Sequence, residues 1–302
     1  MDVPIVVAGA GPLGAATAYH LARQGVQVAI VSQDRPDAAF RSSGGSICWH
    51  RPDPRRAAAI RETADFVRTA VADGARIGCR EVPYLFLTDG VQVPALNVDS
   101  GDLVDHLLAE AGRAGAVRVD LGAVTGIDFG DDGHIVVCER GTVRAGAAVV
   151  ALGAGNPGVV DGLPVAWEKR QLFVLDLPVD GDRASLPHTI AAVGDGYAYV
   201  FVKRFDAGLR VVVGQEDVVE DDATTGPVDH FGELLDTGVA DHFPFLRGAT
   251  VDRILWGLDW PGKLPHVQEH GPRLFSVNCG SAVRACIAGG RAAADAVTTT
   301  LG

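Results

Sequence analysis

Positive charge is scarce in this 302-residue chain. Lysine and arginine together number 26 against 38 acidic residues, which gives a formal net charge of −12 at pH 7. Only three of these cations are lysines (Lys169, Lys203 and Lys263), and no basic run is long enough to follow a phosphate backbone. Nucleic acids and anionic membrane surfaces attract clustered positive charge, so the sequence argues against both as partners.

Paired cysteines and long apolar segments are missing as well. The five cysteines are odd in number and show no C-x-x-C spacing, so neither a disulfide framework nor a structural zinc site is expected. No apolar run approaches the roughly 18 residues that a membrane span needs, and the N-terminal residues lack the basic and apolar regions of a signal peptide. These absences predict a protein of the reducing cytoplasm.

Histidines with the spacing of metal ligands are also absent. A protein metal site needs several ligands converging at one point, which short fixed spacings often announce. Five of the nine histidines are scattered through the chain without such spacing, so we expect no metal and place them at the surface or in turns: His106, His230, His242, His266 and His270.

What the chain does contain is the composition of a folded globular protein, with 47% hydrophobic and 21% charged residues. Helical and extended patterns alternate near both ends, and the middle is rich in strands, which predicts an α/β domain interrupted by a β-rich one. Helices are predicted at 13–24, 55–71, after Ser100, at 227–241 and at 282–297. Strands are predicted at 5–8, 26–31, 117–119, 124–128, 135–138, 147–151, 172–177, 198–205, 209–213, 251–257 and 274–277, with a hairpin turn at 206–208.

A glycine-rich turn joins the first predicted strand to the first helix. The spacing of Gly9, Gly11 and Gly14 is G-x-G-x-x-G in the context that this pattern requires. The first glycine permits the tight turn, the second lets the backbone approach a pyrophosphate, and the third lets the helix pack closely on the strand. The sequence therefore predicts a dinucleotide at the N-terminus of this helix.

The residue expected to hold the ribose is not acidic. Dinucleotide folds commonly place an acid at the end of the second strand, whereas this chain has Ser32, followed by Gln33, Asp34 and Arg35. Serine and arginine there suit the 2′-phosphate of NADP; alternatively, Ser32 or Asp34 takes over the ribose contact. The glycine turn by itself leaves FAD, NAD and NADP open.

The order and spacing of further segments resemble the D-amino-acid oxidase superfamily of FAD enzymes, in particular its glycine oxidase and sarcosine oxidase branch. The resemblance runs nearly from end to end and favours FAD over NADP. It is carried by 9–31 (the first βαβ unit), 41–47 (a second flavin loop), 97–99 with Leu103, 148–155 (a glycine-ended strand), 199–204 with Gly208 and Gly214, 256–265, and the closing Gly280-Ser-Ala-Val-Arg284 with Gly290, Arg291 and Asp295.

The resemblance implies an α/β fold with two domains. A doubly wound, Rossmann-like FAD-binding domain would comprise residues 1–80, 97–166 and 262–302, and a substrate domain with a mixed or antiparallel β-sheet would comprise 81–96 and 167–261. The stretch between Leu87 and Asn97 is expected to be only a turn, where relatives are longer. A more open active site, or one completed by an oligomer or a partner subunit, would follow.

The implied chemistry is removal of a hydride from the carbon beside an amine nitrogen of an amino acid, imino acid or related amine. The product is an imine, and dioxygen or another acceptor would take the electrons. FAD would be bound non-covalently, because neither Cys48 nor Cys279 matches the usual attachment position. The Lys-poor composition hints at a GC-rich bacterial source, where such enzymes often serve secondary metabolism. The cofactor-binding residues implied are Gly9, Ala10, Gly11, Pro12, Leu13, Gly14, Ser32, Arg41, Ser42, Ser43, Gly45, Ser46, Val124, Gly153, Gly280, Ser281, Ala282 and Val283.

Two arginines are the expected substrate ligands. Arg51 lies where sarcosine oxidases carry a carboxylate-binding arginine, and the planar guanidinium can bond both carboxylate oxygens. Arg284 occupies the lysine position of the closing motif, in the predicted first turn of the last helix. A cation is intrinsically unfavourable at a helix N-terminus, which indicates a ligand there. The alternative for both residues is an exposed surface position.

Two further residues are catalytic candidates. Lys203 could stabilise superoxide beside the flavin, with Arg210 as a competitor and a solvent-facing position as the alternative. Asp259 replaces an arginine that glycine-oxidase-like members use for the substrate carboxylate. If it faces the flavin, it would attract a cationic amine instead. Together with Ser32 and with Ser281 in place of a histidine, it departs from the family pattern.

Three functions therefore compete at this point. The first is an FAD-dependent oxidase or dehydrogenase acting on a C–N bond. The second is an NADP-dependent reductase, favoured by Ser32 and Arg35. The third is a degenerate flavoprotein that serves as a subunit or scaffold, although such a protein would have no reason to retain Arg51 and Arg284.

Overall fold

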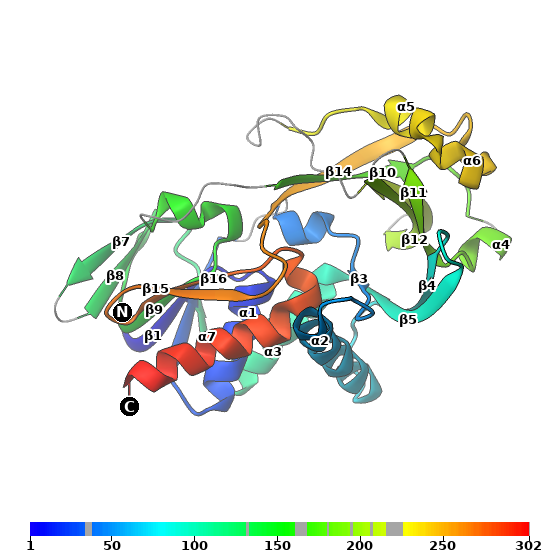
Figure 1. The fold of residues 1–302 in the computed structure, drawn as a ribbon. Helices are drawn as coiled ribbons and strands as arrows, with labels where there is room; N and C mark the ends of the chain where they lie inside the picture. Colours follow the sequence, from blue (N-terminus) through cyan, green and yellow to red (C-terminus); the bar gives the residue numbers. More distant parts are fainter. Residues whose placement is uncertain are drawn as a thin grey trace.

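The computed structural model describes residues 1–33, 38–130, 133–160, 168–179, 181–193, 196–205, 208–215 and 226–301. Two eight-stranded sheets lie beside each other, each with its own helices (Figure 1). None of the helices in these ranges combines the length and the hydropathy needed to cross a bilayer. Asp34, Arg35 and most of the predicted turn at 206–208 lie outside the described residues.

The first sheet has a parallel core in the order β16-β9-β1-β2-β6, with β15 antiparallel at one edge and the β7–β8 hairpin attached to β9. Because β1 lies between β2 and β9, the chain winds away from it in both directions, and this confirms the predicted doubly wound fold. The strands are β1 (Asp2–Ala8), β2 (Val28–Val31), β6 (Val117–Val119), β7 (Val124–Gly130), β8 (Gly133–Cys138), β9 (Gly141–Val150), β15 (His266–Gly271) and β16 (Leu274–Asn278).

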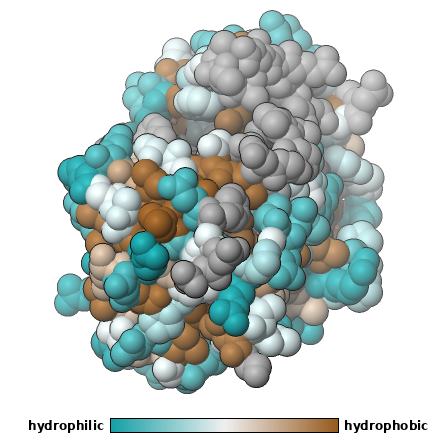
Figure 2. Space-filling model, turned by 90° about the vertical axis from the view of Figure 1, so that its left-hand side faces the viewer, coloured by the Kyte–Doolittle hydropathy of each residue, from teal (hydrophilic) through white to brown (hydrophobic). Residues whose placement is uncertain are grey.

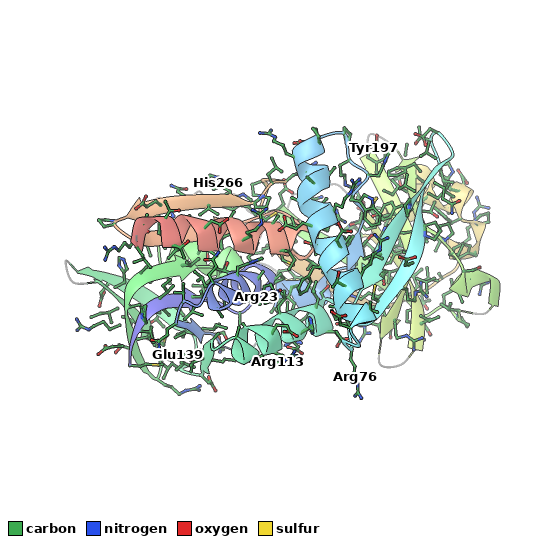
Figure 3. The ribbon with its side chains drawn as sticks, turned by 90° about the horizontal axis from the view of Figure 1, so that it is seen from below. Arg23, Arg76, Arg113, Glu139, Tyr197 and His266 are labelled. Atoms are coloured by element: carbon green, nitrogen blue, oxygen red, sulfur yellow. The ribbon has the colours of Figure 1, made fainter. Side chains whose placement is uncertain are left out.

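Helices cover one face of this sheet. Seen from below, α1 (Pro12–Arg23), α3 (Ser100–Arg113) and α7 (Cys286–Leu301) lie side by side, with α2 (Pro54–Ala72) crossing at their end (Figure 3). Their alanine-rich faces pack onto β1 and β9 in one buried cluster. The other face is covered by the β7–β8 hairpin and the turn at Gly153–Gly158. Figure 2, which views the molecule from the side of β7, β8 and β15, shows apolar residues gathered among polar ones.

The second sheet is mixed, in the order β14-β10-β13-β12-β11-β4-β5-β3. All its pairs are antiparallel except β11 with β4. Its strands come from two distant parts of the chain, which the segment forming β6 to β9 separates. They are β3 (Ser46–Ile47), β4 (Cys79–Phe86), β5 (Val91–Val98), β10 (Glu168–Leu175), β11 (His188–Val193), β12 (Gly196–Phe205), β13 (Gly208–Gln215) and β14 (Val251–Asp259).

Alternating side chains give this sheet two different faces. Phe173 and Leu175 point to one side, where they pack against α5 (Phe231–Leu234) and the chain after α6 (Ala240–His242). Leu172 and Val174 point to the other side, where they pack with Phe201. A short helix, α4 (Gly181–Ala184), precedes β11. The second face looks toward the first domain and becomes one wall of the cleft described below.

One predicted element is wrong, and two others are confirmed only in part. The stretch between Leu87 and Asn97 is not only a turn, because β5 forms a hairpin with β4. The predicted helix at 227–241 is broken: Gly238 has φ +99°, which ends α-helical geometry between the short α5 and α6. The last helix starts later than predicted, at Cys286, after a 3₁₀ turn at Ala282–Ala285.

Candidate active site

A cleft of about 870 Å³ lies between the two sheets and is lined by residues of both. On the first sheet it lies at the carboxyl ends of the parallel strands, where Gly9, Ser32 and Ala151 follow β1, β2 and β9. The chain reverses its direction of winding between β1 and its two neighbours. Open α/β sheets bind their ligands at such a switch point.

The glycine turn is shaped to admit a ligand at one position and to pack tightly at the others. A Cβ on Gly9 (φ +107°) would lie 2.4 Å from the Ala151 carbonyl oxygen, and one on Gly14 would lie 2.0 Å from that of Gly9. A Cβ on Gly11, by contrast, would meet no atom within 4 Å. Gly11 therefore borders open space at the N-terminus of α1, which is the place of a pyrophosphate.

Buried polar atoms without partners line the same cleft. Ser32 is 5% exposed, and its Oγ makes no hydrogen bond to another described residue; the same holds for Oγ of Ser46 and for Nδ2 of Asn278. Buried polar groups are normally hydrogen-bonded. These orphan atoms fit a ligand rich in hydroxyl and carbonyl groups, such as FAD, and Ser32 lies where the ribose is expected.

A second loop, residues 41–46, lines the cleft, and hydrogen bonds from the second sheet hold this loop in place. The Lys203 ammonium donates a hydrogen bond to the Ser43 carbonyl. Asn97 Nδ2 donates to the Gly44 carbonyl over 2.9 Å, and a Cβ on Gly45 (φ +67°) would lie 1.9 Å from the Val98 carbonyl oxygen. The loop is therefore fixed between the two domains.

The structure brings together nearly all the residues predicted to bind the cofactor. Gly14 is the exception, because it packs behind the turn instead of lining the cleft. The others that line it are Gly9, Ala10, Gly11, Pro12, Leu13, Ser32, Arg41, Ser42, Ser43, Gly45, Ser46, Val124, Gly153, Gly280, Ser281, Ala282 and Val283. Cofactor contacts of individual residues remain predictions.

Arg51 and Arg284 both line the cleft, from different elements. Arg51 lies between β3 and α2, and its buried Nε has no hydrogen-bond partner within the described ranges. Arg284 lies in the 3₁₀ turn before α7, and its Nε donates to the Ser46 carbonyl over 2.8 Å. Neither guanidinium forms an ion pair with another described residue, so both are available to an anionic ligand.

Lys203 is not among the residues that line the cleft. It is 5% exposed, and burial lowers the pKa of its ammonium. Its hydrogen bond to the Ser43 carbonyl ties the second loop to β12. This contact supports a loop-holding role, and its role toward oxygen stays a prediction.

Asp259 lines the cleft but is engaged by the backbone. Its two carboxylate oxygens accept hydrogen bonds from the Ser281 amide over 2.7 and 2.9 Å. Ser281 has φ +58°, a left-handed conformation that costs a non-glycine residue about 1–2 kcal/mol. Burial raises the pKa of Asp259, whereas the bond from Ser281 and the charges of Arg170 and Arg284 lower it. The carboxylate thus fixes the Gly280–Ser281 turn at the cleft.

Replacing Asp259 by alanine should therefore loosen this turn. The Ser281 amide would lose its partner, at a cost of about 1–3 kcal/mol of unfolding free energy. We expect a lower midpoint of denaturant unfolding and weaker FAD binding in titrations of the apoprotein. Ser281→Gly, which keeps the amide and suits the left-handed backbone, is the matched control. An Asp259→Ala protein with normal stability and FAD affinity but a raised KM for an amine would instead show that Asp259 binds the substrate.

His188 is a cleft residue that the sequence reasoning missed. It lies at the start of β11, is 4% exposed, and has no partner for either ring nitrogen in the described part of the chain. Burial, and then the positive charges of Arg284 and Arg51, hold its pKa well below the usual 6.5. No local pattern marks it, because its neighbours Tyr84 and Phe201 are far away in the sequence. Within the described ranges, no group of potential metal ligands comes together.

Comparison with known proteins identifies the family. The family model "FAD dependent oxidoreductase" matches residues 4–97 and 87–296. A curated relative, the uncharacterized oxidoreductase YurR of Bacillus subtilis (strain 168), is 42% identical over 43 residues, which is 14% of this chain and 12% of that protein. The chain therefore matches only about an eighth of that relative's length.

Solved structures share the fold over almost the whole chain. Iminodiacetate oxidase from Chelativorans sp. BNC1 is 22% identical with a TM-score of 0.76, covering 98% of this chain and 95% of that chain. L-proline dehydrogenase from P. horikoshii is 17% identical with a TM-score of 0.81 (99% and 94% covered), and glycine oxidase from Geobacillus kaustophilus is 19% identical with a TM-score of 0.75 (99% and 95% covered). Since the family match spans most of the chain and the cleft fits the cofactor, the protein belongs to the FAD-dependent oxidoreductase family of the D-amino-acid oxidase superfamily.

Proposed function

We propose that this enzyme oxidises the C–N bond of an amino acid, imino acid or related amine that carries a carboxylate. The observation that carries the proposal is that Arg51 and Arg284, which form no ion pair with another described residue, lie at the same cleft as the FAD-binding turns. Iminodiacetate, proline and glycine, which the structural relatives' names give as their substrates, are all amines with a carboxylate. A role in secondary metabolism remains a prediction.

In this scheme the residues of the chain bind FAD and the substrate and orient them toward each other. When bound, FAD supplies the group that accepts a hydride and its electrons. The N-terminus of α1 holds the pyrophosphate at Gly11, and Ser32 holds the ribose. Arg51 and Arg284 hold the substrate carboxylate, which fixes the neighbouring carbon in place and contributes orientation to the rate. Dioxygen or another acceptor reoxidises the enzyme.

Aromatic residues of the second sheet keep water away from the substrate. Tyr84 and Phe201 are each 2% exposed and line the cleft with Tyr199. In a dry site, charge-assisted hydrogen bonds from the arginines are stronger than in water. The second sheet thus closes the cleft over the substrate-binding arginines.

The visible absorbance spectrum of the purified protein tests this function. We expect the bands of a bound flavin, and we expect them to bleach anaerobically with at least one of glycine, sarcosine, L-proline or iminodiacetate. A flavin spectrum that no amine or amino acid bleaches would contradict the proposed reaction. A colourless protein that also refuses added FAD but binds NADP would contradict the cofactor as well.

A further inference from the structure

Three aromatic side chains form a row across the second sheet on the cleft side. The pairing of β11 with β4 places His188 opposite Tyr84, and the pairing of β11 with β12 brings Phe201 to its other side. The ring centroids of His188 and Tyr84 are 4.1 Å apart with planes inclined by 18°, and those of His188 and Phe201 are 4.4 Å apart, inclined by 8°. The imidazole is therefore held between two parallel rings, and all three residues line the cleft.

The imidazole of His188 lacks the hydrogen-bond partners that a buried ring normally has. Both ring nitrogens are buried, and neither has a hydrogen-bond partner among the residues that the structure describes. A buried polar group without a partner destabilises the fold, and a ligand that hydrogen-bonds to it removes this penalty. A half-turn of the ring about its last torsion keeps the stack and exchanges the nitrogen and carbon positions. Either orientation therefore presents a nitrogen without disturbing Tyr84 or Phe201.

Burial first, and then the charges around it, lower the pKa of His188 and make it a neutral acceptor. Arg284 and Arg51 are the charged groups that act on it, and both disfavour a proton on the ring. A neutral imidazole has one nitrogen that accepts a hydrogen bond, whereas guanidinium groups only donate. The arginines can therefore serve a carboxylate but not an amine N–H.

The nearby carboxylates are already engaged. Both oxygens of Asp259 accept from the Ser281 amide, and Glu168 pairs with Arg170. His188 lines the same cleft and its nitrogens have no partner among the described residues, so it is the acceptor left uncommitted for an amine that binds beside the two arginines. The positive charge of the arginines also favours the neutral form of that amine, whose lone pair is free to assist loss of the hydride from the next carbon.

We propose that His188 accepts a hydrogen bond from the amine N–H of the substrate, and that the cleft thereby selects primary and secondary amines over fully substituted ones. This assignment rests on the function proposed above. His188 acts as a specificity-determining residue. The arginines recognise the carboxylate. The imidazole recognises the N–H of a neutral amine, which primary and secondary amines have and tertiary amines lack.

Matched pairs of substrates test the assignment. The probes are sarcosine with N,N-dimethylglycine, L-proline with N-methyl-L-proline, and iminodiacetate with its N-methyl derivative. In the wild-type enzyme, the rate of anaerobic flavin bleaching divided by the substrate Kd should be roughly tenfold to a hundredfold higher for the amine with the N–H, the range expected for one buried hydrogen bond. His188→Phe, which keeps the stacked ring, should abolish this preference.

Three controls separate hydrogen bonding from a structural role. His188→Gln, which retains an acceptor, should restore part of the preference. His242→Phe, on the exposed surface of α6, should leave it unchanged. Acetate, a carboxylate without nitrogen, should perturb the flavin spectrum with the same Kd in the wild type and in His188→Phe.

The outcomes distinguish this inference from the function on which it rests. A wild-type flavin that no amine bleaches would overturn both. Bleaching with an unchanged N–H preference in His188→Phe would overturn the His188 assignment alone. Loss of acetate binding in His188→Phe would also overturn it, because the residue would then shape the whole cleft rather than recognise the amine.

Discussion

Arg51→Ala is expected to weaken binding of an amino-acid substrate by about 2–5 kcal/mol, which is the cost of truncating one partner of a buried, charge-assisted pair. The apparent Kd should rise roughly 30-fold or more. The buried Nε without a partner supports a ligand at this guanidinium. Arg51 is a cleaner test than Arg284, whose Nε also holds the Ser46 carbonyl and with it the second loop.

The measurement is the substrate dependence of anaerobic flavin bleaching. Arg51→Lys, which keeps the charge but not the two-pronged geometry, should fall between the alanine variant and the wild type. Arg55→Ala is the matched control, because Arg55 is exposed at the start of α2, where it forms an ion pair with Asp53 across 3.7 Å. An unchanged kcat/KM in Arg51→Ala would remove Arg51 from the substrate site.

Gly11→Val is expected to give a folded protein that has lost FAD. A side chain at this position meets no protein atom within 4 Å, and the backbone is extended (φ −71°, ψ −176°), which valine adopts without strain. The added methyl groups would instead occupy the approach to the pyrophosphate and cover the N–H groups at the start of α1. We expect the affinity for FAD to fall at least a hundredfold, since this overlap removes both contacts.

Titration of the apoprotein with FAD, followed by flavin fluorescence, measures this loss, and circular dichroism verifies the fold. Gly112→Ala, in α3, is the control, because its Cβ also meets nothing and it lies outside the cleft. Gly14→Ala and Gly45→Ala should instead destabilise the fold, since their Cβ atoms would lie 2.0 and 1.9 Å from backbone oxygens. FAD binding by Gly11→Val at wild-type affinity would contradict the proposed place of the pyrophosphate.

The parts of this molecule that depend on local sequence were predictable. The glycine turn, the strand before it and α1 are contiguous, so one sequence pattern predicts both the local structure and the dinucleotide site. The predicted helix at 227–241 forms only in pieces, because the positive φ of Gly238 interrupts it. The β5 strand was missed because Pro94 and the exposed residues Val91 and Gln92 hide its alternation.

The parts of the site that depend on pairing between distant strands were not predictable. The stacked position of His188 in the cleft exists only because β4 and β12 bring Tyr84 and Phe201 beside it. The hydrogen bond that Asp259 accepts from an amide 22 residues further along the chain could not be read from the sequence either, and its role toward a substrate amine stays a prediction. The expected division into FAD and substrate segments, and the expected oligomer or partner subunit, remain predictions.

The interleaving of the two sheets governs how this chain can be made. In the first sheet, β1 pairs with β9, and β9 pairs with β16, which follows it in the chain only after β10 to β15. On the ribosome, β9 has no β16 beside it, and β1 has no α7 beneath it, until those intervening strands have been synthesised. The edge of β9 stays unpaired during that time, and unpaired edges invite aggregation. The nascent chain should depend on chaperones until α7 emerges.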